Sequence, residues 1–123
     1  IILDILIKII IMNYIIKILL TAIAVFVIAN VLPGVSIESY FISIIVAVVI
    51  GLLDSLVKPI LVILTIPITI ITLGLFLFII NAFIILIADY FVVGFGVNNI
   101  IWAAIFSMLL SILQSVLYKV LDN

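Results

Sequence analysis

Thirty consecutive residues, from Pro59 to Ala88, carry no charged side chain. One straight helix of that length would run about 45 Å, which is too long for a hydrocarbon core of about 30 Å. Pro59, Pro67 and Gly74 interrupt the run, and these residue types break or bend helices. The run must therefore divide into a connector, over about 59–74, and a membrane span that follows it.

The composition makes the lipid bilayer the solvent for most of this surface. Of the 123 residues, 72% are hydrophobic and 7% are charged, whereas soluble domains are about half apolar and a quarter charged. A soluble fold of this size has too little interior to bury so much hydrocarbon. We therefore predict an all-α membrane protein, with residues 1–123 as a single transmembrane domain. Its four transmembrane helices are expected near 15–32, 42–58, 75–92 and 102–118.

The sequence of two segments is compatible with more than one structure. Residues 1–11 precede a natural start at Met12, and they are either non-native upstream sequence or an amphipathic helix lying in the membrane interface. The 59–74 connector either extends the second helix beyond a kink, lies in the interface, or dips into the bilayer and out again.

The chain looks duplicated, with repeat halves at about 14–58 and 74–118 that align at a shift of 60 positions. Gly34 matches Gly94, and small residues match at four successive helical turns. Each half would be span, short extended outer loop, span, so both halves share one orientation. This predicts two parallel-repeat hairpins about an axis along the membrane normal. The outer loops, around 35–37 and 95–97, could pair as a two-stranded ribbon.

The matching small residues form a stripe on the second span and another on the fourth. Small residues at every fourth position let helix backbones approach closely in lipid. We expect the second and fourth spans to cross one another within the monomer, although the same stripes could assemble several copies into a pore. The predicted helix-packing residues are Ser43, Ala47, Gly51 and Ser55, with Ala103, Ser107, Ser111 and Ser115.

Four polar residues are candidates for function because polar groups inside a membrane are costly. Asp54 and Lys58 lie four apart, so they share a helix face and can partly neutralise each other. Asp54 and Gln114 occupy equivalent repeat positions and would approach each other near the cytoplasmic end. Asn81 lies near the middle of the third span. For all four, a structural role in hydrogen bonds between helices is the alternative to contact with an ion or solute.

Charge placement and residue inventory limit what the protein does. All four lysines (Lys8, Lys17, Lys58 and Lys119) fall on one side of a four-span arrangement, which by the positive-inside rule makes both termini cytoplasmic. The chain contains no cysteine, histidine or arginine, so we expect no enzyme activity, no metal and no cofactor. A net charge of −1 argues against nucleic-acid binding.

Three segments resemble a known family: Gly51-Leu-Leu-Asp-Ser-Leu-Val-Lys-Pro59, the Thr-Ile-Pro-Ile-Thr segment from Thr65, and Leu73-Gly-Leu-Phe76. Over about 12–121 the chain resembles the bacterial four-span membrane proteins labelled phage holin family 4, the mycobacterial four-span phage holin superfamily. Asp54 and Lys58 stand where that family usually has Asn and Arg.

The resemblance implies a small integral protein of the bacterial cytoplasmic (inner) membrane that permeabilises the membrane or maintains the envelope. A small channel or transporter built on the repeat axis is the alternative. The implied partners are the lipid bilayer and further copies of the chain as a homo-oligomer.

Overall fold

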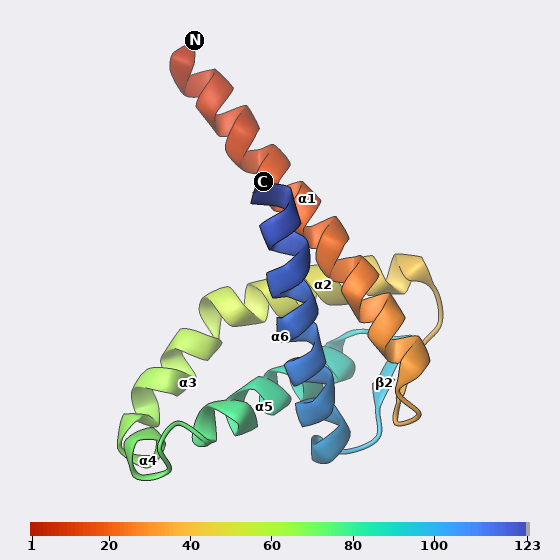
Figure 1. Cartoon of the computed structure of the whole chain (residues 1–123), viewed down its shortest axis with the longest axis vertical. Coiled ribbons are helices and arrows are strands. Elements are labelled where there is room, and N and C mark those ends of the chain that lie inside the picture. The colour runs from red at the N-terminus through yellow and green to blue at the C-terminus, as the bar shows by residue number, and fades with distance from the viewer. Residues whose placement is uncertain (123) are drawn as a thin grey trace.

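The computed structural model describes the backbone of residues 1–122 and the side chains of residues 1–120. Helices form most of the chain, and two short strands lie between them (Figure 1). In chain order the elements are α1 (Ile2–Val31), β1 (Val35–Ile37), α2 (Tyr40–Leu56), α3 (Lys58–Leu64), α4 (Ile66–Ile71), α5 (Phe76–Phe91), β2 (Phe95–Val97) and α6 (Ile100–Asp122).

The four long helices form a ring in which each one contacts two neighbours. α1 packs against α2 and α6, and α5 packs against the same two helices. In Figure 1, α1 with α6 and α2 with α5 form two arms that spread apart away from the end that bears the strands. Within each arm the two helices run in opposite directions, whereas α1 with α2, and α5 with α6, cross at a large angle (Figure 1).

The predicted crossing of the second and fourth spans is wrong. Within residues 1–122, α2 and α6 lie at opposite corners of the ring and make almost no direct contact. Short connections join α1 to α2 and α5 to α6, which makes the members of each pair neighbours. The two pairs meet through α1 with α6 and α2 with α5, so the helices that carry the small-residue stripes stay apart.

Small and branched apolar residues form the core, which lies where the four long helices meet near the ribbon. Ala82 and Ala88 of α5 and Ala103 of α6 are almost completely buried, and alanine at a helix contact allows close approach in lipid. Phe106 of α6 is the largest of the fully buried side chains. Its ring lies against Phe95 of β2 at a centroid distance of 5.6 Å. The core therefore extends from the helices to the ribbon.

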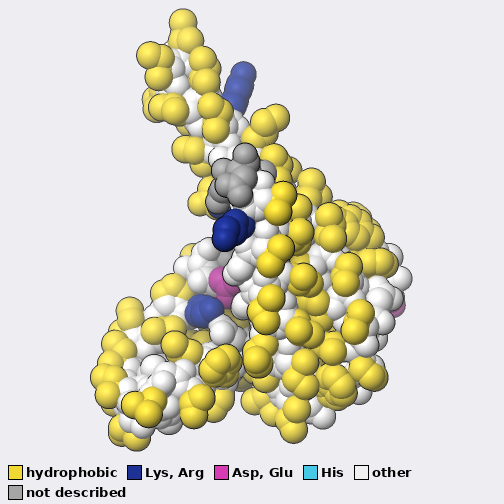
Figure 2. All heavy atoms as spheres, in the orientation of Figure 1, with side chains coloured by type: hydrophobic (Ala, Val, Ile, Leu, Met, Phe, Trp, Pro, Cys, Tyr) yellow, Lys and Arg dark blue, Asp and Glu magenta, His cyan; other side chains and the backbone are white. Residues whose placement is uncertain are grey.

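The outer surface is hydrophobic over most of the face shown in Figure 2. Among the residues that the structure describes, three helices are long and apolar enough to cross a membrane, namely Ile2–Val31, Tyr40–Leu64 and Ile100–Val120. The fourth, α5, is a shorter apolar helix of 16 residues, about 24 Å long at 1.5 Å per residue. The coarse prediction, a helical integral membrane protein, is confirmed.

The N-terminal residues continue the first span. α1 begins at Ile2, and residues 1–11 extend the same helix away from the rest of the protein, with every side chain exposed (Figure 1). Residues 1–11 are thus helical, and both alternatives given for them, upstream sequence and an interfacial helix, stay predictions.

The connector begins as an extension of the second helix. The Val57 N–H donates to the Leu53 carbonyl (2.9 Å) and the Leu61 N–H donates to the Val57 carbonyl (3.1 Å), so α3 continues α2 across a slight break. Pro59 fits there because the first turn of a helix does not need its missing N–H. α4 and a turn at Gly74 (φ 89°) then lead into α5.

The outer loops pair as predicted. β1 and β2 are antiparallel with the register Val35↔Val97, Ser36↔Gly96 and Ile37↔Phe95. Next to this ribbon, the Glu38 N–H donates to the Gly94 carbonyl (3.0 Å) and the Asn98 N–H donates to the Gly34 carbonyl (2.9 Å). Two extended loops close to lipid thereby satisfy each other's backbone groups.

Candidate functional site

The four polar residues singled out from the sequence meet at one place. Asp54, Lys58, Asn81 and Gln114 all line a small pocket of about 30 Å³, together with Ser107 and Ser111. The pocket lies between α2, the start of α3, α5 and α6, at the end of the ring away from the ribbon. A volume of this size holds about one water molecule or one small ion. Figure 2 shows acidic and basic side chains gathered in the hollow between the two arms.

A hydrogen-bonded network joins α1 to α6 beside this pocket. The Gln114 Nε2 donates to the Thr21 hydroxyl (3.1 Å), and the hydroxyls of Thr21 and Tyr118 share a hydrogen bond. The Tyr118 hydroxyl is also within donating distance of the Lys17 carbonyl (3.3 Å). The Lys17 ammonium lies over the Tyr118 ring, 5.5 Å from its centroid, where the ring quadrupole attracts a cation.

Helical spacing explains the network. Lys17 and Thr21 lie four apart on α1, and Gln114 and Tyr118 lie four apart on α6, so each pair occupies one helix face. Gln114 was among the predicted candidates, whereas Tyr118 was not, and Lys17 was used only to predict the orientation in the membrane. The signal was present: at the shift of 60 positions, Thr21, Gln114 and Tyr118 correspond to three residues of the small pocket, Asn81, Asp54 and Lys58.

The small-residue stripes divide into a packed half and an open half. Ser43 and Ala103 are fully buried, and Ala47 and Ser107 nearly so. These four residues lie toward the ribbon. Toward the other end the stripes are exposed, at Gly51, Ser55, Ser111 and Ser115. Gly51 and Ser55 there line a pocket between α1, α2 and α6 rather than a helix contact.

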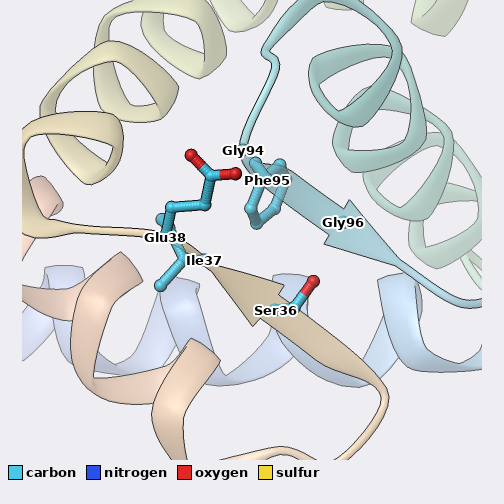
Figure 3. Close-up of a pocket in the computed structure, with 6 residues that line it drawn as sticks. All are labelled: Ser36, Ile37, Glu38, Gly94, Phe95 and Gly96. Carbon is cyan, nitrogen blue, oxygen red and sulfur yellow. The ribbon is translucent and has the colours of Figure 1, made fainter.

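A second hollow lies over the ribbon, at the opposite end of the molecule. It has a volume of about 300 Å³ and is lined by residues 36–38 and 94–96. In Figure 3 the Glu38 and Ser36 side chains both stand over the ribbon, with the Glu38 carboxylate near Gly94. The nearby Asp89 carboxylate already accepts from the Val97 N–H (3.2 Å), so it holds the ribbon in place.

Comparison with known proteins agrees with this architecture. The family model described as "Mycobacterial 4 TMS phage holin, superfamily IV" matches residues 12–116, which is most of the chain. The chain is also similar to the uncharacterized membrane protein YvlD of Bacillus subtilis (strain 168), with 36% identity over 110 residues, 85% of this chain and 88% of that protein. No solved structure matches the chain. The chain therefore belongs to the family of mycobacterial phage holins with four transmembrane segments, superfamily IV.

Proposed function

We propose that this protein is a non-enzymatic component of the bacterial cytoplasmic membrane and that it makes the membrane permeable when several copies assemble. Family membership over residues 12–116 is the observation that carries the proposal. The exposed ends of the two small-residue stripes support assembly, because small residues allow close helix approach in lipid. If the assembled protein does not make the membrane permeable, the function that we propose is maintenance of the envelope.

We further propose that the fold consists of two repeated hairpins about a pseudo-two-fold axis along the membrane normal. The ribbon register supports this, because at the shift of 60 positions Val35 pairs with the equivalent of Ile37, and Ile37 with the equivalent of Val35. The helix caps repeat as well: Ser39 accepts from the Ile42 N–H, and Asn99 accepts from the Trp102 N–H. All four lysines lie away from the ribbon, so we place both termini in the cytoplasm.

Cysteine labelling tests this topology, because the chain has no native cysteine. We expect a membrane-impermeant maleimide to label Asn98→Cys on intact cells, since Asn98 is exposed beside the ribbon. Asn13→Cys, and Leu73→Cys in the connector turn, should react only after the cells are permeabilised. Labelling of the detergent-solubilised protein gives the total amount of reactive cysteine for each variant. Labelling of Leu73→Cys from outside intact cells would contradict the proposed topology.

A channel or transporter remains the second candidate function, and the small polar pocket favours it. An isolated charge at the bilayer centre costs about 2.5–3.5 kcal/mol on insertion scales. A carboxylate, an ammonium and two amides, one from each of four helices, nevertheless line one pocket. Such groups inside a membrane protein often mark the path of an ion. In this alternative Asp54 is the residue that contacts the ion.

A membrane-potential dye in cells with controlled expression separates the two functions. Assembly of many copies predicts a sudden, complete depolarisation once the protein has accumulated. A channel predicts a steady, ion-selective leak that Asp54→Asn lowers at least about tenfold, because the carboxylate that contacts the ion is gone. Glu38→Gln is the matched control, since Glu38 lies at the ribbon end, far along the fold from the polar pocket. A leak that both variants change equally would exclude the channel.

A further inference from the structure

A larger pocket lies between α1, α2 and α6, and its lining has an uncommon composition for a membrane protein. Its volume is about 530 Å³, within the range of about 300–1,000 Å³ that ligand sites usually have. One wall is polar and includes both Lys17 and Asp54. The remaining wall is apolar and includes Val48 and Leu52, whose side chains are 39% and 56% exposed. The pocket therefore joins a charged region to the lipid-facing surface.

The other half of the chain shows that the helix packing alone does not require this lining. A pocket of about 210 Å³ between α5 and α6 is lined by Phe78, Asn81, Ser107, Met108, Ser111 and Ile112. Each of these residues lies 60 positions after a residue of the larger pocket, from Ile18 to Leu52. The smaller pocket has no charged residue in its lining. The same cleft thus occurs twice. Lys17 and Asp54 line the cleft beside α1 itself, whereas the charges near the other cleft, Asp54 and Lys58, lie in the adjoining small pocket.

The polar wall is held in place before any ligand arrives. The network of Thr21, Gln114 and Tyr118 fixes the α6 side of the pocket. The Tyr118 ring holds the Lys17 ammonium at 5.5 Å from its centroid. Binding costs less free energy when the groups that make the contacts are already ordered. A fixed ammonium and a carboxylate from a different helix, at one pocket, match a ligand that carries an anion and a cation close together.

We propose that this pocket binds the headgroup of an aminophospholipid such as phosphatidylethanolamine. Lys17 holds the lipid phosphate, Asp54 accepts hydrogen bonds from the lipid ammonium, and the acyl chains leave across Val48 and Leu52 into the bilayer. A charge-assisted hydrogen bond is about twice as strong as a neutral one, so each charged residue contributes measurably. Free phosphoethanolamine has the same headgroup chemistry without acyl chains, and the apolar wall is the reason that the lipid is favoured.

Lipid retention by the purified full-length protein tests the proposal. Native mass spectrometry in mixed micelles would compare phosphatidylethanolamine, phosphatidylglycerol and phosphatidylcholine. The wild-type protein should retain phosphatidylethanolamine best, since phosphatidylglycerol lacks the ammonium and phosphatidylcholine carries no N–H donor. Asp54→Asn should remove the preference for phosphatidylethanolamine over phosphatidylglycerol. Lys17→Gln should lower retention of all three lipids at least about tenfold, the loss expected for one charged contact.

Three controls make the result decisive. Lys17→Arg keeps the positive charge and should restore retention, which separates loss of binding from loss of folding. Lys119→Gln removes a lysine that does not line the pocket and should change nothing. Phosphoethanolamine should compete poorly. Equal retention of the three lipids by the wild type, unchanged retention in both pocket variants, or full competition by phosphoethanolamine would overturn the proposal. The measurement uses no conductance, so its failure is distinguishable from failure of the channel function.

Discussion

Replacing Phe106 by alanine should destabilise the protein by about 2–3 kcal/mol. Phe106 is fully buried in α6, and its ring packs against Phe95 of the ribbon. In water-soluble proteins such a change costs about 3–5 kcal/mol, as lost transfer free energy plus a cavity term. Here the separated helices would remain in lipid, which is as apolar as the protein core, so most of the transfer part is absent. The cavity and its lost dispersion contacts account for the expected cost.

Unfolding in mixed micelles with increasing dodecyl sulfate, followed by circular dichroism, would measure this change. Phe41→Ala is the matched control because Phe41 is 67% exposed at the start of α2. Because Phe41 faces lipid in both the folded and the unfolded state, its truncation should lower the free energy of unfolding by no more than about 0.5 kcal/mol. Similar costs for the two variants would mean that the core around Phe106 is not packed as described.

The elements of the fold were largely predictable from the sequence. The four apolar segments correspond to α1, α2, α5 and α6, because runs of about 20 uncharged residues are strong signals in a membrane protein. The pairing of the outer loops was also predictable, because extended backbone near lipid needs hydrogen-bond partners.

The choice of helix partners was not predictable from the small residues. The stripe that begins at Ser43 and the stripe that begins at Ala103 show which helix faces allow close approach, but they do not identify the helix that approaches. The structure packs both α2 and α6 against α1 and α5 and leaves α2 and α6 apart from each other. Loop length accounts for part of this arrangement, because a short loop makes α1 a neighbour of α2 and another makes α5 a neighbour of α6.

The polar network was only partly predictable, because its contacts also depend on which helices are neighbours. Asp54 and Asn81 stand out because each is polar within an apolar run. Tyr118 does not stand out, since tyrosine near the end of a span usually marks the membrane interface. Its role depends on Thr21, a residue of another helix that lies 97 positions earlier in the chain. A contact of that kind becomes visible only when α1 and α6 are known to be neighbours.

Replacing Gly34 by alanine should destabilise the protein about as much as a cavity in the core does. A methyl group at Gly34 would overlap the indole ring of Trp102, so the ring or the loop must move. The Gly34 carbonyl also accepts the hydrogen bond from the Asn98 N–H that adjoins the ribbon (2.9 Å). Overpacking at a tight contact costs about 1–3 kcal/mol, and we expect the upper part of that range. Trp102 is the sole tryptophan of the chain, so its fluorescence should report the displacement directly.

Gly51→Ala is the matched control, because a methyl group at Gly51 would meet nothing within 4 Å. Alanine is favoured over glycine within a helix by about 1 kcal/mol, so this variant should be neutral or slightly more stable. A double-mutant cycle with Trp102→Leu then identifies the cause. If the indole ring is the obstacle, Gly34→Ala should cost much less in the Trp102→Leu background than in the wild type, since contacting residues couple by about 0.5–3 kcal/mol. Strictly additive effects would place the strain in the backbone of the loop and not against Trp102.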